Sequence, residues 1–256
     1  MIKKILVCVK LVPSAQTVEM DGQFRLKRDS TTLQLNIADT SALEAALRMK
    51  YELIDAQVVV ISMGPIATEK NLLELYALGV DRVVLLSDRV FAGADSLSTA
   101  KTLAYAAKRL GGFDCIICGR RAIDAETGQI PGQLAAALKI PVITNIQQLH
   151  TEGSTILCER RLENGIVQLE VNAPCVLSVC EYTYKLRLPS IMGKRYARGK
   201  QVEIFSADYI GLSEKECGVK YSKTKVVGVN TKTFGLRRCN YCDIGFLAKK
   251  IREVLP

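Results

Sequence analysis

The segment FDCIICGRRAIDAETGQIPGQLAAAL, residues 113–138, runs from an apolar stretch through a polar turn into a helical pattern. Phe113 to Cys118 is a short apolar run of the kind that forms a buried strand. Apolar side chains recur at helical spacing from Ile130. Pro131 suits the first turn of a helix, because its missing N–H would have no partner there. The segment therefore predicts a strand, a loop and a helix that starts at 128–130.

The start of this helix has the properties of a phosphate site. Unpaired N–H groups there carry roughly half a positive charge. Gly128 lets a ligand approach the backbone, and Arg120 and Arg121 add formal charge. The dinucleotide pattern GxGxxG and the triphosphate loop GxxxxGK[ST] are both absent. The residues alone therefore allow either a nucleotide phosphate site or an ordinary strand-to-helix turn.

Composition sets the class of protein. A chain of 256 residues that is 48% hydrophobic can bury the core of one large domain, alone or with an appendage. It has no apolar run of about 18 residues, so we expect no membrane insertion. The start, MIKKILVCVK, continues into strand-like sequence without a signal-peptide cleavage site, which predicts a cytoplasmic protein. Nine scattered cysteines fit reduced thiols better than a disulfide framework.

Two CxxC spacings are candidates for metal sites. Cys115 and Cys118 lie on the expected strand, where positions three apart face opposite sides, so we expect both in the core. Cys239 and Cys242 have the spacing of a zinc knuckle, but one pair is half a site, and His150 is the only histidine. We therefore expect no metal.

The formal net charge of +9 raises the question of nucleic acid. Basic residues gather late in the chain, at Lys185, Arg187, Lys194, Arg195, Arg198 and Lys200. No RNA- or DNA-binding pattern accompanies them and aromatic residues are few, so we expect no nucleic acid. A basic surface for an acidic protein partner and a merely solvated face both remain open.

The first half of the chain alternates strands with helices. Strands are expected at 2–12, 57–62, 82–86 and 113–118, with a hairpin at 18–26. Helices are expected after Asn36 with the capping-box spacing Ser41-x-x-Glu44, through Leu72 to a stop at Gly79, and from a cap at Asp95 to Gly111-Gly112. This alternation predicts an α/β fold with a doubly wound parallel sheet and right-handed crossovers.

Ligands of such sheets bind beyond the carboxyl ends of the strands. The expected strand ends are Cys8 to Lys10, Met63-Gly64, the segment SDRVFAGAD after Leu86, and Gly119 to Arg121. One pocket would collect all four. The alternative is that these are ordinary turns.

The second half changes pattern after Pro141. Runs at 142–149, 155–161, 166–171 and 175–179 predict antiparallel strands that extend the sheet, with a turn at Glu163-Asn164-Gly165. Regular patterning weakens from Glu181. A final segment places Ile244, Leu247, Ile251 and Leu255 on one helix face and is expected to serve as an arm for a partner. We expect a main domain at 1–227 and the arm at 228–256.

The loop GRRAIDAETGQIPGQLAAAL resembles the nucleotide loop of the electron transfer flavoprotein β subunit. VCVKLVP, ALEAALRMK, VVVISMGP, ALGVDR, RRLENGIVQLEVNAPCVLSV, LPSIMGKRYARGKQVEI, FSADYIG and ECGVKYSKTKV follow in the order of that family, so the resemblance covers roughly Ile2 to Val227. The chain departs from the family at YSKTKV and at Pro131-Gly132, where the family has Gly-Pro. The resemblance implies a fold like that of the adenine nucleotide α-hydrolases.

The resemblance also implies a set of nucleotide contacts. They are Cys8, Asn36, Asp39, Met63 and Gly64 near the strand ends, and Gly119, Arg120, Arg121, Ala122, Ile123, Asp124, Glu126, Thr127, Gly128, Gln129 and Ile130 in the loop. One branch of the family holds AMP here, whereas the electron-bifurcating branch holds a second FAD. LLSDRVFAGADSLSTAKTLA and the GRRAID loop resemble the bifurcating branch. FAD is therefore expected, with Gly93, Ala94 and Asp95 beside the isoalloxazine ring, and AMP is the alternative.

The chemistry implied by the resemblance belongs to the flavin. NADH would reduce this FAD. One electron would pass to a second FAD on an α subunit and on to an acyl-CoA dehydrogenase-like flavoprotein, and the other to ferredoxin or flavodoxin. No side chain is expected to act as a catalytic base or nucleophile, and one histidine leaves no Ser-His-Asp or Cys-His set to assemble.

Leu188-Pro-Ser-Ile-Met192 resembles the docking loop of the family, which implies that Leu188, Ile191 and Met192 contact the dehydrogenase partner. From the residues alone, these side chains would more commonly be core. Two other functions stay open at this point. One is a non-bifurcating electron carrier with structural AMP, and the other is a stand-alone adenine-nucleotide-binding regulator or hydrolase.

Overall fold

The computed structural model describes residues 2–14, 33–53, 55–228 and 243–254. The chain divides into two units, residues 1–225 and 226–256, and each is described by itself. The expected hairpin at 18–26 and the pair Cys239/Cys242 lie outside the described residues.

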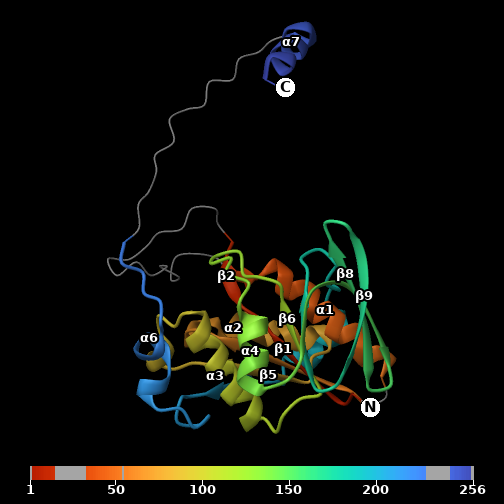
Figure 1. Ribbon diagram of the computed structural model, residues 1–256. Helices are drawn as coiled ribbons and strands as arrows, with labels where there is room; N and C mark the ends of the chain where they lie inside the picture. Colours follow the sequence, from red (N-terminus) through yellow and green to blue (C-terminus); the bar gives the residue numbers. More distant parts are fainter. Residues whose placement is uncertain (1, 15–32, 54, 229–242, 255–256) are drawn as a thin grey trace. The chain divides into compact units, whose positions relative to one another are not determined.

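The larger unit is built on a nine-stranded sheet with the order β11-β5-β4-β1-β6-β10-β7-β8-β9 (Figure 1). Neighbours from β11 to β7 are parallel, whereas β7–β8 and β8–β9 are antiparallel. The strands are β1 (Lys4–Cys8), β4 (Gln57–Met63), β5 (Arg82–Leu86), β6 (Cys115–Gly119), β7 (Val142–Glu152), β8 (Thr155–Leu162), β9 (Gly165–Asn172), β10 (Cys175–Val179) and β11 (Glu203–Phe205). β2 (Leu11–Pro13) and β3 (Leu33–Leu35) pair in a separate sheet, so the single strand expected at 2–12 is in fact two.

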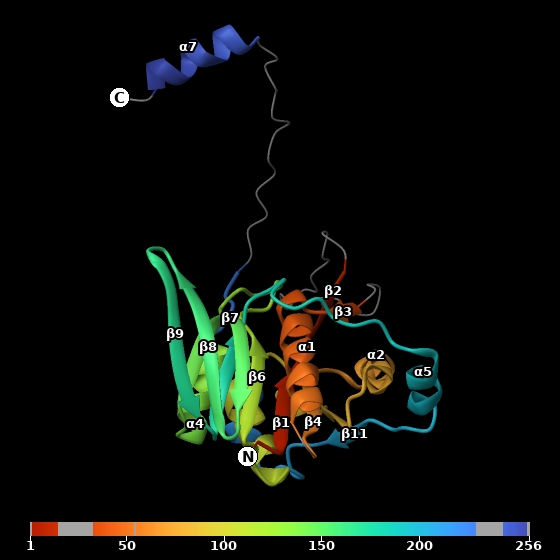
Figure 2. The ribbon, with the colours of Figure 1, turned by 90° about the vertical axis from the view of Figure 1, so that its right-hand side faces the viewer.

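Helices cover both faces of the sheet. They are α1 (Ile37–Glu52), η1 (Ile66–Thr68), α2 (Glu69–Leu73), η2 (Glu74–Leu78), η3 (Arg89–Phe91), α3 (Ser96–Arg109), α4 (Ile130–Leu138), α5 (Ile191–Ala197), η4 (Glu214–Glu216) and α6 (Gly218–Tyr221). The buried side of α1 packs with Ile5 and Val7 of β1, whereas α3 and α4 pack with Leu6 and Cys8 of the same strand. Figure 2 shows α1 in front of β1 and β4. The predicted doubly wound α/β fold is confirmed.

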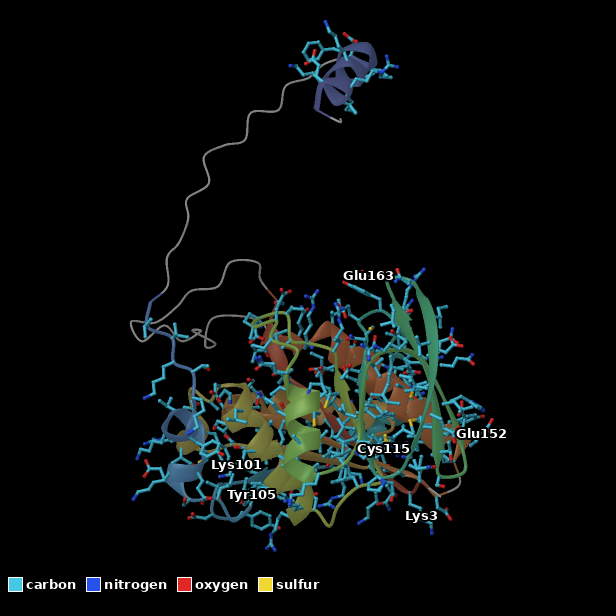
Figure 3. All side chains as sticks on the ribbon, in the orientation of Figure 1. Lys3, Lys101, Tyr105, Cys115, Glu152 and Glu163 are labelled. Carbon is cyan, nitrogen blue, oxygen red and sulfur yellow. The ribbon has the colours of Figure 1, made fainter. Side chains whose placement is uncertain are left out.

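Several local predictions are confirmed. The helical stretch that begins with α2 ends at Gly79, which has a left-handed φ of 102°. Asp95 caps α3, and α4 starts at Ile130. Cys115 and Cys118 are buried in different core clusters on opposite faces of the sheet. The predicted turn after Leu162 connects β8 to β9, where Leu162 pairs with Gly165, and Glu163 lies at the tip of this hairpin (Figure 3).

The prediction that β10 extends the sheet as an antiparallel strand is wrong. β10 lies inside the sheet, parallel to β6 on one side and to β7 on the other. Every residue of its sequence CVLSV is buried. Strands covered on both faces read as nearly continuous apolar runs rather than alternating ones, and β10 fits this pattern with one buried polar residue, Ser178.

The capping box predicted at Ser41 and Glu44 is also wrong. Helix α1 already begins at Ile37, so both residues lie inside it. The backbone N–H of Asn36 donates to the carbonyl of Lys10, which fixes the chain at the end of β1 and lets the helix start at once. The side chains of Ser41 and Glu44 are therefore free to contact a distant segment.

The end of the chain contains elements that the sequence pattern did not reveal. α5 and β11 fall in the region where no regular element was expected. In the larger unit, α6 packs on α3, where the Lys101 ammonium lies 4.1 Å from the Tyr221 ring centroid and 5.6 Å from that of Tyr105 (Figure 3). The smaller unit contains α7 (Ile244–Val254), on which Ile244, Leu247 and Ile251 are exposed. Leu255 lies outside the described residues.

Among the described residues, no helix is both long enough and apolar enough to cross a membrane.

Candidate nucleotide-binding site

The carboxyl ends of β5, β4, β1 and β6 lie side by side in the sheet. The chain passes from β1 outward through β4 to β5 and then returns to β6 on the other side of β1. The helix that follows β1 and the helix that follows β6 therefore cover opposite faces. Such a reversal of strand order opens a crevice where open α/β sheets bind ligands.

Gly119 ends β6 in very close contact with the start of α1. A Cβ atom at this position would overlap Asp39 Oδ1 and would stand 2.7 Å from both the Asp39 nitrogen and the Ala38 carbonyl carbon. Any side chain would push the strand end away from the helix. The glycine therefore sets the distance between β6 and α1 at this point.

Asn36 joins the start of α1 to the loop after β6. Its side chain is fully buried, with 0% of the residue exposed. Asn36 Nδ2 donates to the Arg121 carbonyl at 2.9 Å, and the Ile123 N–H donates to Asn36 Oδ1 at 3.1 Å. Both polar groups of the amide are thus used to shape the loop.

Asp39 lies beneath the same loop. Burial raises the pKa of its carboxyl from 3.8 to about 7, against hydrogen bonds from the Asn36 side chain and the Lys10 N–H that lower it. The Lys10 N–H donates to Asp39 Oδ2 at 2.8 Å. Lys10 Nζ also forms an ion pair with Asp124 Oδ2 at 2.6 Å, so β1, α1 and the loop are tied together.

Arg120 and Arg121 converge on one carboxylate. Arg120 Nη2 lies 2.5 Å and Arg121 Nη2 lies 3.4 Å from Glu181 Oε1, and Arg121 Nη1 lies 3.6 Å from Glu126 Oε2. The hydrogen bond to Glu181 raises the pKa of Arg120. Within the described residues, Arg120 Nε and Glu181 Oε2 are buried without a hydrogen-bond partner. The two arginines are therefore held in place, and the buried N–H of Arg120 Nε is left without an acceptor in the described residues.

A pocket of about 250 Å³ opens beside these arginines. It is lined by Arg120, Arg121, Gly128, Thr144, Asn145 and Ser178. Sequence reasoning missed the last three residues and Glu181. They lie on β7 and β10 or directly after β10, and the parallel placement of β10 beside β6 is what brings them to this end of the sheet.

The rest of the loop faces outward. Ala122 is half-buried, and Ile123, Glu126, Thr127, Gly128 and Gln129 are exposed, whereas the Asp124 side chain, paired with Lys10, is 11% exposed. Glu126 and Gly128 have left-handed φ values of 52° and 61°. Gln129 Oε1 accepts a hydrogen bond from Ser96 Oγ at 2.7 Å, which connects the end of the loop to the first residue of α3.

Gly93, Ala94 and Asp95 lie just before α3 and thus next to Gln129. The Asp95 carboxylate is already used: Oδ1 accepts from the Ser98 N–H at 2.8 Å, and Oδ2 accepts from the Lys223 and Thr224 N–H groups at 2.7 and 3.0 Å. Although burial acts to raise the pKa of Asp95, these hydrogen bonds lower it overall. Gly93 is exposed and Ala94 half-buried, so the surface offered here is small and carries no large side chain.

Apolar side chains pack beneath these strand ends. Cys8 at the end of β1 belongs to the core cluster of α3 and α4, and Met63 and Ile130 pack against the same cluster. The Gly64 N–H donates to the Leu86 carbonyl at 3.1 Å, which closes the end of β4 against β5. The residues predicted to contact a nucleotide thus lie around adjacent strand ends. They come from β1, β4, the loop after β6 and the start of α3.

The segment expected to dock a partner lies elsewhere, between β10 and β11. Leu188, Ile191 and Met192 are 89%, 87% and 71% exposed, so these side chains are not core. A groove of about 520 Å³ beside them is lined by Ile191, Lys194, Arg195 and Arg198. The surface combines apolar and positively charged side chains.

Comparison with known proteins shows the family of the chain. Residues 24–208 match the model of the electron transfer flavoprotein domain. The electron transfer flavoprotein subunit beta of Thermoanaerobacterium thermosaccharolyticum is 40% identical over 229 residues, which cover 89% of this chain and 87% of that protein. The chain belongs to the electron transfer flavoprotein β-subunit family.

Two further relatives are named as subunits of reductase systems. The caffeyl-CoA reductase-Etf complex subunit CarD of Acetobacterium woodii is 37% identical, with 87% of this chain and 86% of that protein covered. The acryloyl-CoA reductase electron transfer subunit gamma of Anaerotignum propionicum is 39% identical, with the same coverage of 87% and 86%. As an electron transfer flavoprotein β subunit, the chain acts in electron transfer with an α subunit. Its own cofactor and redox partners stay predictions.

Proposed function

We propose that this chain is the β subunit of a cytoplasmic, electron-bifurcating electron transfer flavoprotein. It holds FAD in the crevice, takes electrons from NADH, and sends one to the FAD of the α subunit and an acyl-CoA dehydrogenase-like flavoprotein. The other goes to ferredoxin or flavodoxin. The observation that carries this proposal is the hydrogen bond between Ser96 and Gln129, because it joins the arginine-bearing loop to the small residues before α3. One extended ligand is thereby able to span both.

The residues present fit a dinucleotide. The buried Nε of Arg120 has no partner within the described residues, and an anionic phosphate is the acceptor that such a donor favours. Gly128 presents backbone without a side chain at the pocket. The half-buried Met63 and Ile130 offer apolar surface for a ring system, and the exposed Gly93 leaves room for a second, flat ring.

The flavin would supply the redox chemistry, because it can accept a hydride from NADH and pass on the two electrons one at a time. This chain's residues would bind and orient it. Arg120 and Arg121 would neutralise phosphate, and the loop fixed by Asn36 would hold the backbone N–H groups toward it. The seven described cysteines are free thiols, which supports a reducing compartment such as the cytoplasm.

The partner class is supported by the docking segment and by the relatives. The names of two relatives attach them to caffeyl-CoA reductase and acryloyl-CoA reductase. The exposed Leu188, Ile191 and Met192 give this chain an apolar surface for a flavoprotein of the acyl-CoA dehydrogenase type. A groove lined by Lys194, Arg195 and Arg198 next to it would favour an acidic rim on that partner.

The nucleotide content of the heterodimer tests the proposal. The chain is co-expressed with its α subunit and purified, the complex is denatured, and the released nucleotides are separated and quantified. Two FAD per heterodimer, together with reduction of the flavin by NADH without oxygen, are expected. One FAD and one AMP would overturn the bifurcating function and leave a plain electron carrier. Failure to form a heterodimer would contradict the assignment to this kind of complex.

A further inference from the structure

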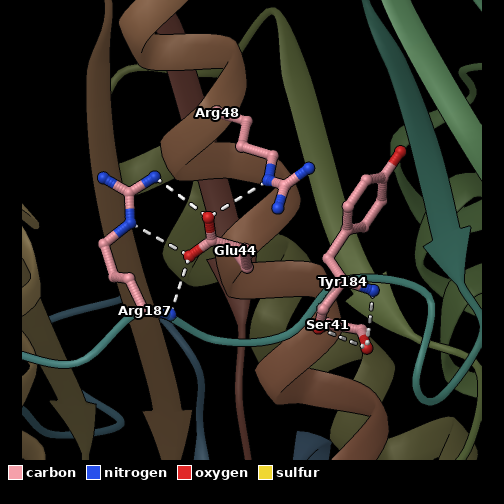
Figure 4. A network of polar contacts seen from close by, with 5 residues as sticks. All are labelled: Ser41, Glu44, Arg48, Tyr184 and Arg187. Atoms are coloured by element: carbon pink, nitrogen blue, oxygen red, sulfur yellow. Dashed lines mark hydrogen bonds and ion pairs between the residues drawn. The ribbon is translucent and has the colours of Figure 1, made fainter.

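The segment between β10 and the docking residues lies along α1 (Figure 4). Glu44 in the middle of α1 is only 4% exposed. Its carboxylate accepts from the Arg187 N–H at 3.1 Å, from Arg187 Nε at 3.0 Å and from Arg187 Nη2 at 3.1 Å. Arg48 Nε adds a fourth hydrogen bond at 3.1 Å. The residue directly before Leu188 is thus held by both its backbone and its side chain.

A second anchor precedes the first. Ser41, one turn of α1 before Glu44, exchanges hydrogen bonds with the backbone of Tyr184 at 3.2 and 3.5 Å. The Tyr184 hydroxyl accepts from the Leu149 N–H at 3.0 Å, and the Arg48 guanidinium lies 5.0 Å from the Tyr184 ring centroid. Residues at this spacing share one face of a helix, so α1 presents a row of contacts to the segment.

The charge state of Glu44 fits this arrangement. Burial acts to raise its pKa, but the hydrogen bonds from Arg187 and Arg48 outweigh it and lower the pKa overall. A buried carboxylate with bidentate guanidinium bonds requires one geometry, and breaking one partner leaves an uncompensated charge. The backbone up to Arg187 is therefore fixed, whereas the Leu188 side chain is 89% exposed.

An exposed apolar side chain on a fixed backbone loses less conformational freedom on binding than one on a mobile loop. We propose that Arg187 is a positioning residue: by pairing with Glu44 it holds Leu188 in its docking position before any partner arrives. The partner surface that fits is an apolar socket with an acidic rim, since Lys194, Arg195 and Arg198 line the neighbouring groove. This inference rests on the proposed docking role of Leu188.

Hydrogen exchange and partner kinetics test the inference on the full chain in its heterodimer with the α subunit. Arg187→Ala is compared with Lys185→Ala, which removes the same charge two residues earlier; no ion pair of Lys185 is found within the described residues. The amide hydrogens of residues 186–188 and 190 are expected to exchange roughly tenfold faster or more in Arg187→Ala and to stay unchanged in Lys185→Ala. The KM for the dehydrogenase partner should rise in Arg187→Ala, while kcat is kept.

Two further variants separate the possible failures. Arg187→Lys keeps the charge without the bidentate geometry, so its exchange rates and its KM should lie between those of wild type and Arg187→Ala. It also replaces the alanine variant if that variant does not fold. Unchanged hydrogen exchange in both Arg187 variants would overturn the positioning role. The role would also be overturned if exchange becomes faster in Arg187→Ala but the KM for the partner stays unchanged, while Leu188→Ala raises that KM. An unchanged KM in Leu188→Ala would instead refute the docking function, whatever the exchange at 185–190.

Discussion

Gly119 and Asp39 lie so close that a methyl group on Gly119 would overlap the Asp39 carboxylate and stand 2.7 Å from the Asp39 nitrogen. The end of β6 and the start of α1 are both fixed by hydrogen bonds, so neither can move apart without breaking some of them. Gly119→Ala should therefore lower the free energy of unfolding by about 1 to 3 kcal/mol, as overpacking typically does. It should also weaken nucleotide retention.

Urea unfolding measures the first effect, and the nucleotide content of the purified heterodimer measures the second. Gly132→Ala is the matched control, since a Cβ at Gly132, on helix α4, meets nothing within 4 Å. Alanine should even stabilise that helix by up to about 1 kcal/mol. Equal stability of the two variants would contradict the close approach at Gly119.

Replacing both Arg120 and Arg121 by alanine should release the nucleotide. Charge-assisted hydrogen bonds contribute about 1.5 to 3 kcal/mol each, so the dissociation constant of the nucleotide should rise roughly tenfold to a hundredfold or more. Titration of the stripped heterodimer with FAD and with AMP measures it. The exposed Lys3 and Lys70, changed together to alanine, control for the loss of two positive charges. Unaltered affinity in the arginine variant would remove both residues from the site.

Glu44→Gln should change how stability depends on pH. The pKa of Glu44 in the folded chain lies below 4.5, so its ion pairs stabilise the fold above that pH. This contribution is lost as the pH falls through the folded value. The wild type should therefore lose stability more steeply than Glu44→Gln below about pH 4.5, while Glu44→Gln is less stable at neutral pH. Denaturant unfolding across this pH range is the measurement, and parallel pH profiles would speak against the ion pair.

Asp95→Ala should loosen the segment after α6. The change removes the N-cap of α3 and the acceptor for the Lys223 and Thr224 N–H groups, and loss of the cap alone costs about 1 kcal/mol. Trypsin should then cleave at Lys220 and Lys223 faster than in wild type. Asp208→Ala is the control, because Asp208 is exposed and no hydrogen bond of its side chain is found in the described residues. Equal cleavage of all three proteins would show that Asp95 does not hold the segment.

The sequence predicted the parts of the fold that local pattern determines. Apolar runs such as QVVVIS and RVVLL, each bounded by turn residues, are strands β4 and β5. Asp95 and Gly79 bound their helices as their chemistry requires. In these stretches the residues that decide the structure are neighbours in the chain.

The errors occur where distant contacts decide. Ser41 and Glu44 have capping-box spacing, but the hydrogen bond from Asn36 to Lys10 starts the helix earlier, and both side chains serve the segment at Tyr184 and Arg187. No pattern in the neighbouring sequence indicates that Ser41 and Glu44 contact this distant segment. β10 is different, since its nearly continuous apolar run, with Ser178 as one polar residue, was itself evidence for a parallel inner strand.

The candidate site shows the same division. The loop from Gly119 to Ile130 was found from glycines, arginines and a proline close together in sequence. Glu181, which pairs with both arginines, was missed because it becomes a neighbour of β6 only through the placement of β10. A carboxylate directly after an inner strand is the signal that would have found it.

The inner position of β10 also sets an order for building the protein. β7, β8 and β9 are synthesised before β10, yet β7 is joined to the rest of the sheet through β10. Until Cys175 to Val179 has left the ribosome, β6 keeps an open edge, and β7, β8 and β9 can pair with one another but not with the parallel part of the sheet. β10 is thus inserted between strands already present, and a chain that stops short of it leaves β6 and β7 each with an exposed edge of the kind that promotes aggregation.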